Sequence, residues 1–223
     1  MFRHTLPFAP EAARIGLFGG SFDPPHAGHL HISREALKRL RLDQVWWLVS
    51  PGNPLKSRGP APLDARINAA RALQAGHPKL RVTGIEAQLG TRFTAQTLRH
   101  MQALYPKLRF VWMMGADNLA QFHLWQDWQE IISSLPIAVF ARPQAGLPAR
   151  FSKAARAFDA ARVAPELAYS LADYEAPAWT YLTLPLRSES SSQLRAAGVW
   201  SLEPRSGLAY CAARLARDNE VGR

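Results

Sequence analysis

An eleven-residue stretch from Gly19 to His29, which reads GGSFDPPHAGH, constrains the fold of this chain more than any other segment. It follows the short apolar run of residues 15–18, which is typical of a buried parallel strand. It leads into residues 29–40, whose apolar residues recur at helical spacing. A strand, a tight glycine turn and a helix N-terminus in this order predict a phosphate-binding site, because backbone amide groups and the positive end of the helix dipole meet there.

The residue types within this stretch suit a bound phosphate for separate physical reasons. Gly19 and Gly20 carry no Cβ, so a ligand can approach their backbone closely and unusual φ angles cost little. Asp23 predicts a helix cap, with the following proline at the first helical position. His26 and His29 stand three residues apart, so both rings face the same way within one helical turn. Paired imidazoles at such a place suit an anion whose charge grows during a reaction.

Together these residues resemble the phosphate-binding signature of the nucleotidylyltransferase superfamily, whose core reads His-x-Gly-His. The longer form is similar to the nicotinate-nucleotide adenylyltransferase branch. A metal site at the two histidines is the alternative, but no Glu or third ligand stands in a metalloprotease pattern here. The resemblance implies that the segment binds ATP through Gly19, Gly20, Ser21, Phe22, His26, Gly28 and His29, and that Ser21 also lies beside nicotinate mononucleotide.

The 223 residues are enough for one large α/β domain with an ample core. We expect residues 1–13 to form an N-terminal extension and residues 14–223 a single domain, with C-terminal helices from about residue 189. Residues 1–13 carry no continuous apolar core of a secretory signal, and no apolar run approaches membrane-spanning length. The one cysteine, Cys211, excludes an internal disulfide framework and favours a cytoplasmic protein.

The formal net charge of +10 has two interpretations. A basic surface attracts nucleic acid, and a nucleotide- or RNA-binding module is the non-enzymatic alternative. However, the positive residues are scattered from Arg3 to Arg223 without a dense cluster or an RNA-binding aromatic motif. The charge therefore favours an enzyme whose small substrates are phosphorylated, since a positive field attracts them too.

The next part of the chain predicts a second buried strand, a loop and a helix. Residues 44–49 are the strand, and the polar, basic loop of residues 52–60 leaves its end, where open α/β sheets place ligands. Lys56 in this loop is either a solvated lysine or a contact to a triphosphate; the family has a lysine or arginine there, although Leu55 replaces its usual histidine. Residues 63–75 predict an amphipathic helix in which Ile67 faces inward and Arg66 is partly exposed.

Residues that resemble the family's pyridine-nucleotide site follow. A helix is expected from Thr91 or Thr94, either of which would cap it, to residue 104. The run FTAQTL from Phe93 resembles the aromatic-Thr-x-x-Thr-Leu motif, which implies that Phe93 and Thr94 border nicotinate mononucleotide. Residues 122–132 are expected to be helical; Trp125 matches the family's stacking tryptophan, whereas Trp128 is expected in the core. Arg142, after a strand at residues 137–140, either helps to hold phosphate or is a surface arginine.

Two further segments favour contacts to ATP. Asp117 follows the apolar strand of residues 108–114 within a Gly-x-Asp-x-Leu pattern similar to the family's, and either binds ribose or caps the next helix. Residues 188–195 form a hydroxyl-rich turn that enters a helix. Capping explains one serine there, but the turn also resembles the superfamily's Ile-Ser-Ser-Thr-x-x-Arg signature, which implies ATP contacts from Ser190, Ser191, Ser192 and Arg195.

Strands alternating with helices predict an α/β fold with a doubly wound parallel sheet, a Rossmann-like nucleotidyltransferase fold. The resemblance implies an adenylyltransferase that joins ATP and nicotinate mononucleotide into deamido-NAD and pyrophosphate by direct in-line attack. Its catalytic residues would be His26, His29, Lys56 and Arg195, with Mg²⁺ carried by ATP. A sister transferase, such as phosphopantetheine adenylyltransferase or a cytidylyltransferase, is the enzymatic alternative. Neither the preference for nicotinate over nicotinamide nor the formation of a homo-oligomer follows from the sequence.

Overall fold

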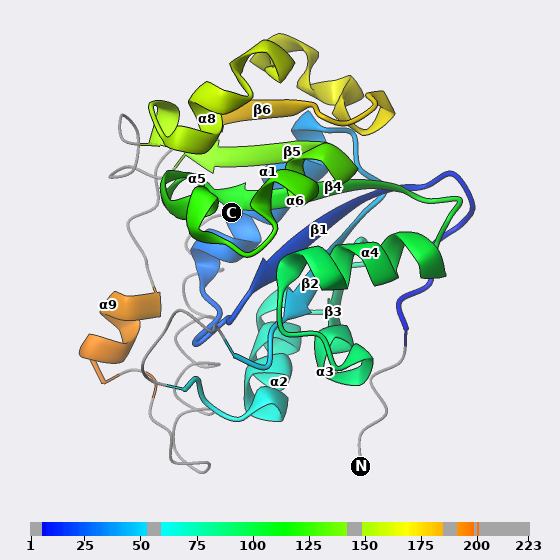
Figure 1. The fold of residues 1–223 in the computed structure, drawn as a ribbon. Coiled ribbons are helices and arrows are strands. Elements are labelled where there is room, and N and C mark those ends of the chain that lie inside the picture. Colours follow the sequence, from blue (N-terminus) through cyan, green and yellow to red (C-terminus); the bar gives the residue numbers. More distant parts are fainter. Residues whose placement is uncertain (1–5, 53–58, 142–148, 185–190, 199, 201–223) are drawn as a thin grey trace.

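Six parallel strands form one sheet in the computed structural model, which describes residues 6–52, 59–141, 149–184, 191–198 and 200 (Figure 1). The strands lie in the order β3-β2-β1-β4-β5-β6, and every neighbouring pair is parallel. Their bounds are β1 (Arg14–Gly20), β2 (Gln44–Val49), β3 (Leu80–Thr83), β4 (Arg109–Gly115), β5 (Ile137–Ala141) and β6 (Trp179–Thr183). The predicted doubly wound parallel sheet is confirmed.

Helices cover both faces of the sheet (Figure 1). One face is covered by α1 (Ala27–Arg39), α2 (Leu63–Gln74) and the 3-10 helix η3 (Pro165–Asp173). The other is covered by α3 (Ile85–Leu89), α4 (Thr94–Leu104), α5 (Ala116–Gln121), the 3-10 helix η1 (Phe122–Leu124), α6 (Trp128–Ser134) and α8 (Lys153–Ala157). The short 3-10 helix η2 (Asp159–Ala161) follows α8, and α9 (Ser191–Ala196) comes after β6.

Alternate side chains of each strand enter the two cores, which explains the unbroken apolar runs of the sequence. In β4, Trp112 belongs to the core beneath α4 and α6, whereas Met113 belongs to the core beneath α1 and α2. Both side chains are at most 2% exposed. Because both faces of the sheet are buried, its strands consist of consecutive apolar residues, and this is the pattern that predicted them from the sequence.

The segment expected to be one helix from Phe122 to Ile132 is broken instead. It forms η1 and then α6, and Asp127 between them has a left-handed φ of 55°. A residue in that conformation cannot continue a right-handed helix. The break lets two tryptophans, Trp125 and Trp128, both pack edge-on against Phe122, at ring-centroid distances of 5.4 and 6.0 Å.

The expected threonine cap of the helix at residues 94–104 is also wrong. The N-cap position of α4 is Phe93, which makes no side-chain capping bond. The Thr91 hydroxyl is instead hydrogen-bonded to the Thr97 hydroxyl at 2.8 Å, and Thr94 is already inside the helix.

Among the residues that the structure describes, no helix has the length and apolarity to cross a membrane.

Candidate active site

The strand order reverses between β1 and β4, whose carboxyl ends lie next to each other, and this is where we expect a ligand crevice. The chain runs outward from β1 through β2 to β3 and then returns to β4 on the other side of β1. Open α/β sheets bind ligands where the order reverses in this way, because the loops that leave the two central strands diverge. Gly20 ends β1 and Gly115 ends β4, so the His-x-Gly-His segment and Asp117 both begin at this crevice.

The two histidine rings of this segment lie next to each other at the start of α1. His26 is the N-cap residue of α1, and the His26 and His29 ring centroids are 3.8 Å apart. This confirms that the rings face the same way. The His26 backbone amide donates a hydrogen bond to His29 Nδ1 at 3.2 Å. Because Nδ1 accepts, the proton of the neutral His29 ring is on Nε2, which makes Nε2 a hydrogen-bond donor.

Phe22 and the β2 residue Trp47, both buried, hold His29 in this orientation. The Phe22 ring lies 4.9 Å from the His29 ring, the indole of Trp47 stacks on Phe22 at 4.9 Å and 7°, and the Trp47 and His29 rings are 6.0 Å apart. Trp47 Nε1 donates to Ser33 Oγ at 2.8 Å, and Ser33 Oγ donates to the His29 carbonyl oxygen at 2.9 Å. The ring and the backbone of His29 are therefore both anchored to β2 from inside the core.

The glycine turn works differently from the sequence interpretation. Neither Gly19 nor Gly20 has a positive φ; the left-handed residue of this segment is Phe22, at 46°. A Cβ on Gly19 would lie 2.3 Å from the Trp112 ring, so this position needs glycine for packing. A Cβ on Gly20 would make only ordinary contact with Phe22, at 3.4 Å, so packing does not require glycine at this position.

Asp23 does not cap α1, which contradicts the expectation. The helix begins at Ala27, and Asp23 lies three residues before its N-cap. The Asp23 carboxylate is instead buried, and its Oδ1 accepts hydrogen bonds from Trp200 Nε1 at 2.6 Å and from the Ala61 amide at 3.3 Å. The proline that follows Asp23 is therefore not the first helical residue either.

The second predicted anion-binding segment meets the first at Asp23 and Pro24. Ser191 Oγ donates to the Pro24 carbonyl oxygen at 2.9 Å. The Arg195 guanidinium donates to the Asp23 carbonyl oxygen and lies 3.8 Å from Asp23 Oδ2. It also donates to Ser192 Oγ at 3.1 Å. Figure 1 shows α9 near the carboxyl end of β1, so two segments almost 170 residues apart in sequence lie against each other.

Arg66, which the sequence analysis expected to be partly exposed, is fully buried. Its Nε donates to the Ala61 carbonyl at 2.7 Å, and its Nη1 donates to the carbonyls of Ser21 at 2.6 Å and Ser50 at 2.7 Å. Its Nη2 donates to the Pro51 carbonyl at 3.3 Å. One guanidinium thus joins the loops that leave β1 and β2. Arg66 lies four and seven residues before buried Ala70 and Leu73, and this spacing was the signal for its burial.

Two buried groups make this region electrostatically unusual. Burial lowers the pKa of Arg66, while the negative charges of Asp23 and Glu86 act in the opposite direction. Burial raises the pKa of Glu86 to about 7, and the positive charge of Arg66 opposes that rise. Glu86 lies in α3, directly after β3. The sequence analysis assigned no role to Arg66 or Trp200, which bond to Ser21 and Asp23. It also assigned none to Glu86, whose negative charge acts on Arg66.

The structure locates the remaining predicted site residues as follows. Phe93 and Thr94 are half-buried at the N-terminus of α4, and Trp125 is half-buried just after η1. Asp117 is exposed in the first turn of α5. Trp128, which was expected in the core, is half-buried at its margin and packs against Phe122 and Phe158. The predicted residues Lys56, Arg142 and Ser190 lie outside the described residues, as does Cys211.

No group of three or more His, Cys, Asp or Glu side chains that could hold a metal ion occurs among the residues described.

The chain is similar to known proteins over most of its length. The family model described as cytidylyltransferase-like matches residues 17–197. A protein of Ruegeria pomeroyi named "Probable nicotinate-nucleotide adenylyltransferase" is 55% identical over 199 residues, which are 89% of this chain and 93% of that protein. A protein of the same name from Cereibacter sphaeroides is 61% identical over 186 residues, which are 83% of this chain and 98% of that protein.

Among solved structures, the fold matches the Plasmodium falciparum nicotinic acid mononucleotide adenylyltransferase complexed with NaAD, with a TM-score of 0.64. The two chains are 16% identical, and the match covers 82% of this chain and 83% of that one. The solved structure supports the fold, and the curated relatives identify the branch. This chain belongs to the cytidylyltransferase-like family and, within it, to the nicotinate-nucleotide adenylyltransferases.

Proposed function

We propose that this nucleotidyltransferase joins ATP and nicotinate mononucleotide to give deamido-NAD and pyrophosphate. The observation that carries the proposal is the contact between the two anion-binding segments, where Arg195 and Ser191 bond to the backbone of Asp23 and Pro24. Because both segments belong to one site, a single triphosphate can lie against both. The names of the curated relatives, which cover most of this chain, support the identity of the two substrates.

The proposed reaction is a direct in-line displacement at the α-phosphorus of ATP. An oxygen of the mononucleotide phosphate forms the new bond, the bond from the α-phosphorus to its bridging oxygen breaks, and pyrophosphate leaves. A phosphate monoester already carries a nucleophilic oxygen, so the protein mainly positions two anions and stabilises negative charge. His29 Nε2 would donate to the bridging oxygen as charge grows there, and His26 would lie against the same phosphates.

The β- and γ-phosphates would be neutralised by Arg195 and Lys56, with the hydroxyls of Ser190, Ser191 and Ser192 as further donors. A guanidinium suits this role because its fork binds two oxygens of a phosphate together. In the structure, Arg195 already lies beside Ser192 Oγ at 3.1 Å. Mg²⁺ would arrive on ATP and be held mainly by phosphate oxygens and water, since this ion keeps most of its water shell.

The acceptor nucleotide would lie beside the helices that follow β3 and β4. Phe93 and Thr94 at the start of α4 and Trp125 after η1 are the proposed contacts to nicotinate mononucleotide, with Arg142 on its phosphate. Trp125 has one ring edge against Phe122, which fixes the indole while leaving it half-buried. Asp117 would accept hydrogen bonds from the ribose hydroxyls of ATP. We further propose that the enzyme works in the cytoplasm.

The test is pyrophosphate release from ATP with four acceptors offered separately: nicotinate mononucleotide, nicotinamide mononucleotide, phosphopantetheine and no acceptor. The proposal expects the highest kcat/KM with nicotinate mononucleotide and the formation of deamido-NAD in equal amount to pyrophosphate. Faster release with phosphopantetheine would point to the sister transferase. No release with any acceptor, together with salt-sensitive RNA binding, would favour the nucleotide- or RNA-binding alternative.

A further inference from the structure

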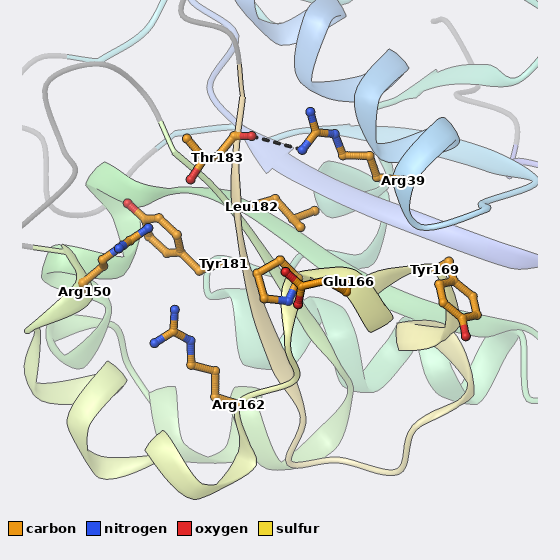
Figure 2. Close-up of a pocket in the computed structure, with 9 residues that line it drawn as sticks. Arg39, Arg150, Arg162, Glu166, Tyr169, Tyr181, Leu182 and Thr183 are labelled. Atoms are coloured by element: carbon orange, nitrogen blue, oxygen red, sulfur yellow. Dashed lines mark hydrogen bonds between the residues drawn. The ribbon is translucent and has the colours of Figure 1, made fainter.

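A second basic cavity lies at the edge strand β6, on the opposite side of β4 and β5 from β1 (Figure 2). Its volume is about 410 Å³, within the lower range of pockets that hold small ligands. Three arginines, Arg39, Arg150 and Arg162, line it together with a single carboxylate, Glu166. None of these residues takes part in the site proposed for adenylyl transfer.

Arg39 at the end of α1 closes one end of this cavity. Its Nε donates to Glu35 Oε2 at 2.8 Å, and its Nη1 donates to the Thr183 carbonyl oxygen at 3.0 Å. The charge of Arg39 is therefore largely balanced by Glu35, and its side chain ties α1 to the last residue of β6. Figure 2 shows this bond as the upper border of the cavity.

Arg150 and Arg162 are held by aromatic rings rather than by carboxylates. The Arg150 guanidinium lies over the Tyr181 ring, 4.8 Å from its centroid, and the Arg162 guanidinium lies over the Trp179 ring at 5.5 Å. Within the described part of the chain, neither arginine forms an ion pair. Stacking orients each guanidinium but leaves its charge and its N–H groups for another partner.

The two supporting rings stand on the same face of β6. Trp179 and Tyr181 are two residues apart in one strand and belong to the same core. Side chains at this separation point the same way, and their Cα atoms are about 6.6 Å apart. Arg162 and Arg150 are therefore held over neighbouring rings on one face of the strand, and both line the same cavity.

We propose that this cavity binds a small phosphate-bearing anion between Arg150 and Arg162. Two planar guanidiniums with fixed orientation select tetrahedral oxyanions, because each can donate two parallel hydrogen bonds to one phosphate. The ligand is either free pyrophosphate or the phosphate of a mononucleotide. Glu166 is the one carboxylate among the residues that line the cavity, so it directs the negative charge of the ligand toward the arginine side.

The test is isothermal titration calorimetry with inorganic pyrophosphate and, in a separate arm, with AMP. Three proteins are compared: the wild type, the variant R150A/R162A and the control K153A/R156A. The control removes the same charge from exposed positions on the neighbouring helix α8. Turnover of R150A/R162A with ATP and nicotinate mononucleotide is measured too and is expected to equal that of the wild type, which shows that the variant is folded.

At least one of the two ligands should bind to the cavity of the wild type and of the control. The variant R150A/R162A should bind that ligand about tenfold or more weakly, while its binding at the adenylyl-transfer site is kept. The ligand that shows this loss identifies the source of the phosphate. The variant R150K/R162K keeps both charges but should also bind the ligand more weakly than the wild type, because lysine lacks the paired N–H groups with which a guanidinium binds two phosphate oxygens. Identical isotherms for R150A/R162A and the wild type in both arms would overturn the proposal, as would an equal loss in the control.

Discussion

The buried guanidinium of Arg66 bonds to the carbonyl oxygens of Ser21 and Ser50, at 2.6 and 2.7 Å, and so joins the ends of β1 and β2. Ser21 belongs to the phosphate-binding segment, and Ser50 follows the strand whose Trp47 supports Phe22 and His29. The position of the segment from Gly19 to His29 therefore depends on a cation that lies in the interior of the protein.

Replacing Arg66 by methionine should strongly destabilise the protein. The carbonyl groups of Ala61, Ser21, Ser50 and Pro51, whose bonds to Arg66 are buried or partly buried, would lose their donor, which costs about 3 kcal/mol or more in free energy of unfolding. Urea denaturation measures this loss. Arg71→Met is the matched control, because Arg71 is exposed on the same helix; a loss as large in the control would show that the hydrogen bonds of Arg66 are not the cause.

Glu86 should make stability fall as pH rises from about 4.5 to about 7. Its pKa is raised from 4.5 to about 7 in the folded protein, so the native state binds the proton more tightly than the unfolded state. The stability from Glu86 is complete below pH 4.5 and is lost as pH passes 7, on the order of 3 kcal/mol. Glu86→Gln should remove most of this dependence, measured as Tm against pH. An equal slope in both proteins would contradict the assignment.

Arg195→Lys should weaken the use of ATP although the charge is kept. Lysine cannot contact the Asp23 carbonyl and Ser192 Oγ together, and it cannot bind a phosphate in the bidentate manner of a guanidinium. We expect KM for ATP to rise about tenfold, with little change for nicotinate mononucleotide. Steady-state kinetics with each substrate varied in turn gives both values. Arg34→Lys, on the exposed side of α1, is the control and should behave as the wild type.

Trp125→Ala should affect the other substrate. The indole is half-buried beside Phe122, and its loss removes the proposed stacking surface for the pyridine ring. We expect KM for nicotinate mononucleotide to rise about tenfold, as stacking on an aromatic ring contributes about 1–3 kcal/mol. Leu124→Ala is the control, because Leu124 is the large residue next to Trp125 and its side chain is 60% exposed. It tests whether the loss of any large side chain from this segment raises KM for nicotinate mononucleotide. A rise in KM for ATP alone would place Trp125 elsewhere in the site.

The sequence predicts the sheet and the two anion-binding segments because both depend on local patterns. Residues 44–49 are apolar enough to be a strand in any α/β context, and His26 and His29 share a face by spacing alone. The predictions failed where a tertiary partner overrides a local preference. Asp23 has the side chain of a helix cap, but Trp200, far along the chain, supplies a better donor at 2.6 Å. Arg66 has the polarity of a surface residue, yet four carbonyl groups from distant loops hold it inside.

The orientation of His29 could not be predicted either, because it depends on contacts across the sheet. The relay from Trp47 through Ser33 to the His29 carbonyl involves β2 and α1, and only the folded chain brings these residues together. The hydrogen bond from the His26 amide to His29 Nδ1 then leaves the proton on Nε2. This atom is the proposed donor to the oxygen that leaves with pyrophosphate.

The most direct measurement is therefore the turnover of His29→Ala with saturating ATP and nicotinate mononucleotide. The variant His31→Ala, two residues further along α1, serves as the control, and the Tm of each protein shows that it is folded. We expect kcat of His29→Ala to fall by about a hundredfold to a thousandfold and that of His31→Ala to stay within about twofold of the wild type. A folded His29→Ala protein that releases pyrophosphate at the wild-type rate would contradict the assignment of His29 to the leaving oxygen.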